Sequence, residues 1–214
     1  MTDKARILLV DDHPLLRTGV LQLIALEDDL EAVGEASSGE EALTQASSLD
    51  PDLILLDLNM KGMNGIDTLI ALREAEVTSR IVMFTVSDNQ EDVVAALQAG
   101  ADGYLLKDME PDDLIRKIRL AANGQLVLSE ELTELLALAI QSKSRKETKV
   151  DIKSMTKRER QILKLLAAGM TNKHIARKLD ITEGTVKVHI KHLFKKLNLK
   201  SRVEAAIWAM EHKI

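Results

Sequence analysis

The sequence predicts an α/β domain built on a parallel sheet, followed by a smaller all-α domain. From residue 6 to residue 123, short apolar runs alternate with longer segments of helical period, as expected for a sheet covered by helices on both faces. From residue 156 onward the period is helical throughout. The length of 214 residues is sufficient for two such domains, each with its own core.

The charge distribution supports the same division. Residues 1–153 carry 15 Lys and Arg against 29 Asp and Glu, a net charge of −14, whereas residues 154–214 carry 14 against 5, a net charge of +9. A small domain with this positive excess is typical of proteins that bind a nucleic-acid backbone. Aromatic residues make up only 2% of the chain, which argues against binding by base stacking.

Five βα units can be placed in the first domain. The expected strands span 6–10, 32–36, 53–56, 81–85 and 103–106, and the expected helices 14–27, 39–48, 66–74, 91–99 and 111–123. Ser38 followed by Glu41 fits a capping box at the second helix, and Gly100 stands where the fourth helix should end. The best candidate is a flavodoxin-like five-stranded parallel sheet of order 2-1-3-4-5, which places strands one and three side by side.

The rest of the chain is expected to be helical, apart from a linker. A helix over 129–141 is followed by a charged, apolar-poor segment over 142–154, typical of a mobile linker. A second capping box, Thr156 with Glu159, should open the all-α domain. Its four expected helices span about 156–168, 172–179, 183–197 and 201–210, and the second and third form a helix-turn-helix. The expected divisions are 1–125, 126–153 and 154–214.

Ionisable residues follow three of the expected strands. Asp11 and Asp12 come after the first strand, Asp57 after the third, and Lys107 after the fifth. Because the carboxyl ends of parallel strands meet at one edge, these groups should form a site for Mg²⁺ and a phosphoryl group. Asp57 is the best candidate for the nucleophile, since a carboxylate can attack phosphorus and form an acyl phosphate. Lys107 and the hydroxyl of Thr85 could hold the phosphoryl oxygens.

The histidines and the single tyrosine are interpreted as structural residues. His13 adjoins the acidic pair, but a lone histidine before proline is interpreted as a loop residue. The histidines of the basic domain lack carboxylate or cysteine partners at metal-ligand spacing. Tyr104 is interpreted as an ordinary strand residue.

The third helix of the all-α domain has the pattern of a DNA-recognition helix. Its apolar positions, spaced three or four apart, should face the core. The positions left outside are Lys187, Val188, Lys191, Lys195 and Lys196. Lysine can donate to guanine, and a small apolar side chain can meet a thymine methyl group in the major groove. Gly184, near the start of this helix, lowers helix propensity by up to about 1 kcal/mol.

Some classes of protein are disfavoured by composition. Cysteine is absent, so no disulfide framework can form. No apolar run approaches the roughly 18 to 20 residues of a membrane span, and the start of the chain does not resemble a signal peptide. We therefore expect a cytoplasmic protein with no membrane partner.

Four motifs of the first domain, in order and at family spacing, resemble the CheY-like receiver domain of two-component response regulators. They are LLVDDHP, LILLDLNMKGMNG, TVS at 85–87 and GADGYLLKD. The resemblance implies that a histidine kinase phosphorylates Asp57, and that Asp11, Asp12, Asp57 and the backbone carbonyl of Asn59 hold Mg²⁺. It also implies that Lys107 contacts the phosphoryl group, that Thr85 moves toward it, and that Tyr104 turns inward. One departure is Lys61, where many receivers have proline.

The segment TKRERQILKLLAAGMTNKHIARKLDITEGTVKVHIKHLFKKLNLKSRVEAA resembles the four-helix DNA-binding domain of the LuxR/NarL family. The resemblance implies base contacts by Lys187, Val188 and Lys191, a homodimer formed through the last helix, and an inverted-repeat site on double-stranded DNA. RNA polymerase is a further candidate partner. In the resting state the receiver is expected to cover the recognition helix.

The motifs LDLNMKGM, TVSD and GADGYLLKDMEP resemble the regulators of nitrate- and nitrite-responsive genes within this family. The chain is therefore expected to be a phosphorylation-controlled transcription factor, and not an enzyme beyond its own phosphorylation and slow dephosphorylation. One alternative is the same architecture responding to another stimulus. A Mg²⁺-dependent phosphohydrolase is a second, but Asn59 stands where such enzymes carry an acid. A LuxR-type sensor of a lipid-like ligand is a third, but it would need a large apolar pocket.

Overall fold

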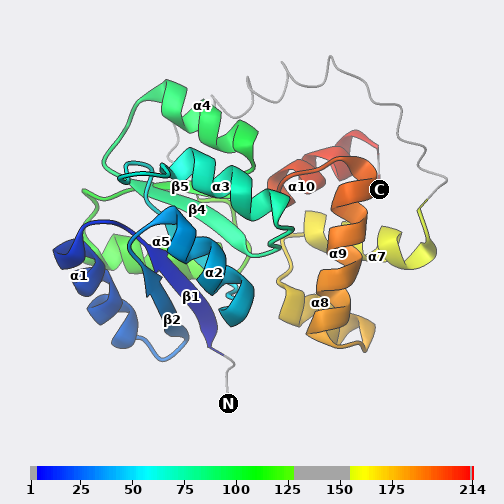
Figure 1. The fold of residues 1–214 in the computed structure, drawn as a ribbon. Helices are drawn as coiled ribbons and strands as arrows, with labels where there is room; N and C mark the ends of the chain where they lie inside the picture. The colour runs from blue at the N-terminus through cyan, green and yellow to red at the C-terminus, as the bar shows by residue number, and fades with distance from the viewer. Residues whose placement is uncertain (1–3, 128–154, 213) are drawn as a thin grey trace.

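The computed structural model describes residues 4–127, 155–212 and 214. Its sheet has the order β2-β1-β3-β4-β5, with all neighbouring strands parallel, which confirms the predicted topology. β1 and β3 therefore lie side by side near the centre of the first domain (Figure 1). The strands are β1 (Ala5–Val10), β2 (Leu30–Ala36), β3 (Leu53–Leu56), β4 (Arg80–Thr85) and β5 (Gly103–Leu106).

Helices cover both faces of the sheet. Alternate residues of β1 point to opposite sides, so Ile7 and Leu9 join one core while Leu8 and Val10 join the other. The first core is completed by α1 (Pro14–Ala25) and α5 (Pro111–Ala122), the second by α2 (Gly39–Leu49), α3 (Gly65–Glu74) and α4 (Gln90–Ala99). Two buried faces explain why the strands read as continuous apolar runs.

Helix ends agree with the sequence except at one cap. Gly100 ends α4 with a φ of 108°, a conformation that glycine adopts without strain. Ser38 caps α2 by accepting a hydrogen bond from the backbone N–H of Glu41. The reciprocal half of that expected capping box is wrong, because the Glu41 carboxylate accepts from the N–H and hydroxyl of Ser37, at 2.7 Å and 2.9 Å.

The second domain has one core shared by all its helices. They are α7 (Lys157–Ala167), α8 (Asn172–Leu179), α9 (Glu183–Leu197) and α10 (Arg202–Glu211), and α7 opens with the predicted capping box of Thr156 and Glu159. α8 and α9 form the helix-turn-helix. The expected helix over 129–141 and the linker over 142–154 lie outside the described residues.

The helical domain packs against the edge of the sheet where the strands begin (Figure 1). Asp102, just before β5, accepts a hydrogen bond from the backbone N–H of Arg202 at the start of α10, with an N–O distance of 2.9 Å. Lys173 of α8 lies 3.1 Å from the carboxylate of Asp52, just before β3. The two domains therefore meet at the end of the sheet opposite to the predicted phosphoryl site.

Among residues 4–127 and 155–212, no helix is both long enough and apolar enough to cross a membrane.

Candidate functional site

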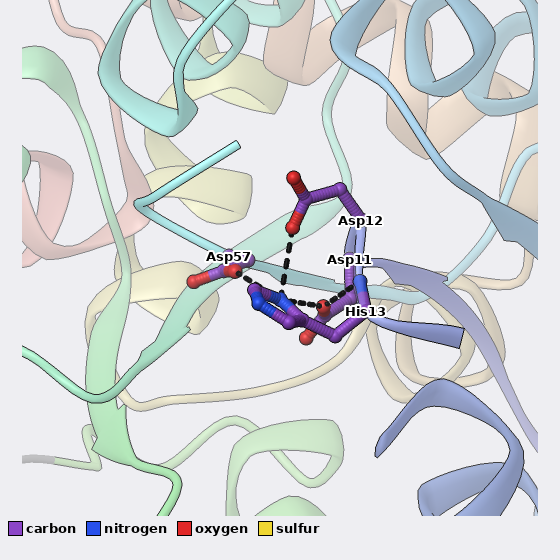
Figure 2. A group of neighbouring side chains, drawn as sticks. All are labelled: Asp11, Asp12, His13 and Asp57. Atoms are coloured by element: carbon purple, nitrogen blue, oxygen red, sulfur yellow. Dashed lines mark hydrogen bonds and ion pairs between the residues drawn. The ribbon is translucent and has the colours of Figure 1, made fainter. Parts of the chain in front are cut away.

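Three aspartates meet where β1 and β3 end. Asp11 and Asp57 are almost completely buried, whereas 14% of the Asp12 side chain is exposed. Together with His13, they offer ligand atoms that all lie within 4.8 Å of one another (Figure 2). The predicted acidic site is thus assembled in space, because adjacent parallel strands end at the same edge.

Lys107, after β5, closes this cluster. Its Nζ lies 2.7 Å from Asp11 Oδ2 and 2.7 Å from Asp57 Oδ2, and only 6% of its side chain is exposed. Burial raises the pKa of the Asp57 carboxyl above its usual value, while the hydrogen bond and charge of Lys107 act in the opposite direction. The lysine therefore helps to keep Asp57 in the ionised form that a nucleophile needs.

His13 belongs to the cluster, although the sequence led us to interpret it as a loop residue. Its backbone N–H donates to Asp11 Oδ1 at 2.8 Å, and its Nδ1 lies 2.9 Å from Asp12 Oδ1. The imidazole points toward the carboxylates (Figure 2), with 67% of the side chain exposed. This contact could have been predicted from the position of His13 directly after Asp11 and Asp12, because residues that follow the end of a strand lie at the same end of the sheet.

The cluster has the donor set of a divalent-metal site. One buried oxygen from each aspartate, Asp11 Oδ2, Asp12 Oδ1 and Asp57 Oδ2, lies against Lys107 or His13, so three carboxylates share one lysine and one histidine. Carboxylate oxygens gathered in this way fit Mg²⁺, which binds through few carboxylates and completes its shell with water and phosphoryl oxygens. These three residues would hold the ion. The Asn59 carbonyl stays a predicted ligand, although the Asn59 N–H does donate to Asp57 Oδ1 at 3.3 Å.

The loop after β3 is folded closely against the acidic cluster. The backbone N–H of Lys61 donates to Asp12 Oδ2 at 3.3 Å, a bond that proline at this position could not make. Gly65, at the start of α3, donates to the Leu58 carbonyl at 2.8 Å. A Cβ atom on Gly65 would lie 2.2 Å from the backbone oxygen of Asp57, so only glycine fits here.

The two predicted switch residues lie on neighbouring strands behind the cluster. The Thr85 hydroxyl accepts from the backbone N–H of Ser87 at 3.2 Å and from the Asn59 side-chain amide at 3.5 Å. Tyr104 is already turned inward, with its hydroxyl donating to the Ser87 carbonyl at 2.9 Å. Burial raises the pKa of Tyr104 to about 12, so it remains a hydrogen-bond donor at neutral pH.

In the second domain, α9 presents the predicted pattern of buried and outward positions. Val186, Ile190, Leu193 and Leu197 are buried in the domain core, and Phe194 packs against it. The predicted contact residues do not share one environment. Val188 and Lys195 are exposed, Lys187 and Lys191 are half-buried, and Lys196 is exposed but has its Nζ 2.9 Å from Glu159 of α7.

Each of the two domains matches a known protein family. Residues 7–119 match the response regulator receiver domain, and residues 153–209 match the bacterial regulatory proteins of the luxR family. The chain is 59% identical to the nitrate/nitrite response regulator protein NarL of Escherichia coli, over 99% of this chain and 98% of that protein. The chain belongs to the LuxR/NarL family of response regulators.

Other relatives of this response regulator share the same organisation. The nitrate/nitrite response regulator protein NarP of Escherichia coli is 47% identical over 97% of this chain and 95% of its own. The crystal structure of the response regulator ChrA from a heme-sensing two-component system matches with a TM-score of 0.51 and 32% identity, over 98% of both chains. A receiver joined to a LuxR-type DNA-binding domain makes this protein a transcriptional response regulator, as expected from the sequence.

The recognition helix of this response regulator is engaged by the receiver. Lys187 Nζ lies 2.5 Å from Asp50 Oδ2, in the turn between α2 and β3, and 15% of the lysine side chain is exposed. Lys173, on the preceding helix, also donates to the backbone carbonyl of Lys4 at 3.0 Å. A side chain predicted to read a base is thus held by the other domain.

Proposed function

We propose that a sensor histidine kinase phosphorylates Asp57 and thereby switches this transcriptional response regulator from a closed form to a form that binds DNA. The observation that carries the proposal is the burial of Asp57 beside Lys107 and the carboxylates of Asp11 and Asp12, at the opposite end of the sheet from the held recognition helix. The aspartates would hold Mg²⁺, which, when bound, neutralises charge on the phosphoryl oxygens.

The residues of the site have distinct tasks in phosphoryl transfer. An oxygen of Asp57 attacks the phosphorus of the donor, so that one P–O bond forms as the bond from phosphorus to the donor histidine nitrogen breaks. The N–H of Asn59 orients the carboxylate by donating to its other oxygen. Lys107 stabilises the charge that moves from Asp57 onto the phosphoryl oxygens, and burial of its side chain strengthens that interaction.

Charge alone does not explain how phosphorylation would release the recognition helix. Phosphorylation adds about −1.5 to −2 charges, and extra negative charge on the receiver would attract the basic domain more strongly. Asp57 and Asp52 flank β3 at its opposite ends, a distance of about 17 Å for the five residue steps between them. Release therefore requires a conformational change, for which Thr85 and Tyr104 are the proposed switch residues. Coupling energies of about 1–3 kcal/mol predict a graded switch.

On DNA we expect a homodimer on an inverted repeat, paired through α10. Lys187, Val188 and Lys191 would contact bases, while Lys195 and Lys196 would contact phosphates. RNA polymerase is a further proposed partner. Because the relatives that match nearly the whole chain are named nitrate/nitrite response regulators, we propose that nitrate or nitrite is the stimulus detected by the kinase and that the target genes serve anaerobic respiration. The same architecture serving another stimulus is the alternative.

Phosphorylation and DNA affinity can be measured on one sample. The full chain is incubated with Mg²⁺ and a small phosphodonor, acyl phosphate is followed by mass spectrometry, and DNA affinity by fluorescence anisotropy. We expect labelling, dimerisation and tighter DNA binding in the wild type and in Asp113→Ala, which removes an exposed carboxylate, and none of these changes in Asp57→Ala. Labelling of Asp57→Ala, or labelling of the wild type without a gain in DNA affinity, would refute the switch.

The stimulus is tested in cells. A reporter gene that responds to nitrate in cells that express the cognate kinase and this regulator would support the proposed stimulus. A response to a different signal through the same Asp57 would favour the alternative.

A further inference from the structure

A cavity of about 390 Å³ lies between the two domains, at the edge of the sheet where the strands begin. Arg80 and Asp52 of the receiver line one side, and Asn172, Lys173 and Arg202 of the helical domain line the other. The volume falls near the lower end of the range for small-molecule sites, about 300–1,000 Å³. The cavity exists only while the domains are in contact.

Arg202 brings an incompletely satisfied cation to this cavity. Its side chain is 8% exposed, and its Nη2 donates to the Asn172 side-chain oxygen and to the Thr78 carbonyl. The other two guanidinium nitrogens, Nε and Nη1, are buried without a hydrogen-bond partner. Burial, followed by the nearby charge of Arg80, lowers the pKa of Arg202 to about 9. A buried guanidinium in this state is costly unless an anion accompanies it.

The carboxylates near the cavity already have other partners. Asp29 forms an ion pair with Arg119 at 2.7 Å, and Asp52 accepts from Lys173 and from the backbone N–H of Arg6. Within the described residues, neither Arg202 nor Arg80 has a carboxylate within ion-pair distance. Among these residues the Arg80 guanidinium donates to the backbone carbonyls of Ala121 and Gly169, at 3.3 Å and 3.4 Å.

The lining as a whole is cationic. Four side chains, those of Arg80, Lys173, Arg177 and Arg202, carry positive charge against the two carboxylates of Asp29 and Asp52. The first turn of α8 adds backbone N–H groups and the positive end of a helix dipole to the same wall. A cationic lining favours an anionic ligand, and the guanidinium groups of arginine are suited to phosphate oxygens.

We propose that this cavity binds a small tetrahedral oxyanion, either inorganic phosphate or the phosphate group of a small phosphomonoester, between Arg80 of the receiver and Arg202 of the DNA-binding domain. Each domain supplies one of the two arginines, so the anion binds the closed arrangement and stabilises it by mass action. At an anion concentration ten times its dissociation constant, the closed form gains about elevenfold over the open form. This regulatory consequence rests on the proposed function, whereas the binding itself does not.

Binding is tested by calorimetry on the full, unphosphorylated chain. Inorganic phosphate and glycerol 3-phosphate are titrated separately, with EDTA present so that the acidic site holds no metal, and sodium chloride and sodium nitrate serve at matched ionic strength. We expect saturable binding of one phosphate or phosphomonoester per chain and no saturable heat from chloride or nitrate. Tighter binding of glycerol 3-phosphate would identify the phosphomonoester as the ligand, and equal or weaker binding would identify inorganic phosphate. Equal behaviour of all four salts would overturn the proposal.

Variants separate the cavity from general charge effects. Arg202→Gln should weaken phosphate binding by about tenfold, the typical effect of losing one hydrogen bond to a charged group. Because Arg202 is buried, Lys173→Gln provides a second test at a partly exposed position and should also weaken binding. Arg116→Gln removes an exposed cation of α5 outside the cavity and should leave phosphate affinity unchanged. If this control lost as much affinity as both cavity variants, the site would be wrong.

A DNA-binding assay distinguishes this inference from the proposed function. Phosphate should lower the DNA affinity of the unphosphorylated chain further than chloride does at the same ionic strength. If phosphate binds but DNA affinity follows ionic strength alone, the closed form does not restrict DNA binding, and the locking role is lost. If phosphate does not bind while phosphorylation still increases DNA affinity, the anion site is wrong and the switch stands.

Discussion

The two ends of one sheet carry unbalanced charges of opposite sign. Where the strands end, Asp11 and Asp57 are buried, and both carboxylates share the single cation of Lys107. Where the strands begin, the buried guanidinium groups of Arg80 and Arg202 donate to neutral oxygens among the described residues. The first end is assembled within one domain and is therefore present in every conformation of the protein. The second end forms only when the two domains meet, so a ligand bound there favours the arrangement in which they are in contact.

Asp102 offers the most disruptive test of the second end. Its carboxylate lies 2.7 Å from Arg73 Nη2 and accepts from the backbone N–H groups of Ile81 and Arg202. Asp102→Ala would leave the buried guanidinium of Arg73 without its ion pair. We expect a loss of about 3–5 kcal/mol in the free energy of unfolding, the usual cost of breaking a buried pair, measured by urea denaturation.

A matched control separates the buried pair from an ordinary surface pair. Asp113 pairs with Arg116 within α5, and more than half of each side chain is exposed. Asp113→Ala should cost at most about 0.5 kcal/mol. Similar losses from Asp102→Ala and Asp113→Ala would mean that the buried pair of Asp102 with Arg73 contributes little to stability.

At the opposite end of the sheet, where the strands end, removing a buried charge should increase the stability of the protein. Asp57→Asn removes a buried charge while Lys107 keeps its ion pair with Asp11, so the free energy of unfolding without Mg²⁺ should rise at pH 7 by about 0.5–2 kcal/mol, as at other functional sites. Burial raises the pKa of Asp57 in the folded state, so the folded protein binds this proton more readily than the unfolded chain does. Lowering the pH through the folded pKa therefore stabilises the wild type relative to the variant.

Urea denaturation at several pH values checks this sign. The free energy of unfolding of Asp57→Asn should exceed that of the wild type by less as the pH falls. The difference should vanish below the pKa that Asp57 has in the unfolded chain. If the difference in the free energy of unfolding between Asp57→Asn and the wild type stayed constant from pH 7 to low pH, the pKa of Asp57 would not be raised by folding. A loss of stability at pH 7 would show that its ion pair with Lys107 outweighs the cost of burial.

The first end of the sheet could be predicted from the sequence because each of its parts is local. Asp57 directly follows a buried apolar run, and Lys107 does the same. The parallel order then brings the strand ends together without any further information. His13 lies in the loop after β1, as predicted, but its contact with the aspartates was not expected. The reciprocal bond from Glu41 was misplaced because a neighbouring serine offers two donors to the same carboxylate.

The second end could not be predicted from the sequence. Arg80 begins a strand, Asp50 lies in a turn, and Arg202 begins a helix in the other domain, so no periodic pattern links them. Their contact depends on how two separately folded domains meet, and the charge division predicted only that they attract. The family resemblance predicted that the receiver would cover the recognition helix, but no pattern in the sequence pointed to Asp50 as the partner of Lys187.

Asp50→Asn tests that pairing with a smaller expected effect. Asp50 has a φ of 49°, which asparagine tolerates, so the change removes the charge with little strain. Because the pair with Lys187 is partly exposed, we expect the unphosphorylated chain to bind DNA about two- to fivefold more tightly, by fluorescence anisotropy. Asp28→Asn removes an exposed charge elsewhere and should leave DNA affinity unchanged. An equal gain in both variants would indicate a general charge effect.

Lys61→Pro should produce the smallest change. It tests whether the backbone N–H of residue 61 affects the affinity of the acidic cluster for Mg²⁺. Proline removes the backbone N–H that donates to Asp12 Oδ2, so Asp12 should attract Mg²⁺ slightly more strongly. The bond is exposed and 3.3 Å long, and hence weak, so we expect the Mg²⁺ dissociation constant to fall by less than about threefold in calorimetry. Lys61→Ala keeps the N–H and removes the charge of the side chain. If Lys61→Ala strengthened Mg²⁺ binding as much as Lys61→Pro, the side-chain charge rather than the backbone donor would set the affinity.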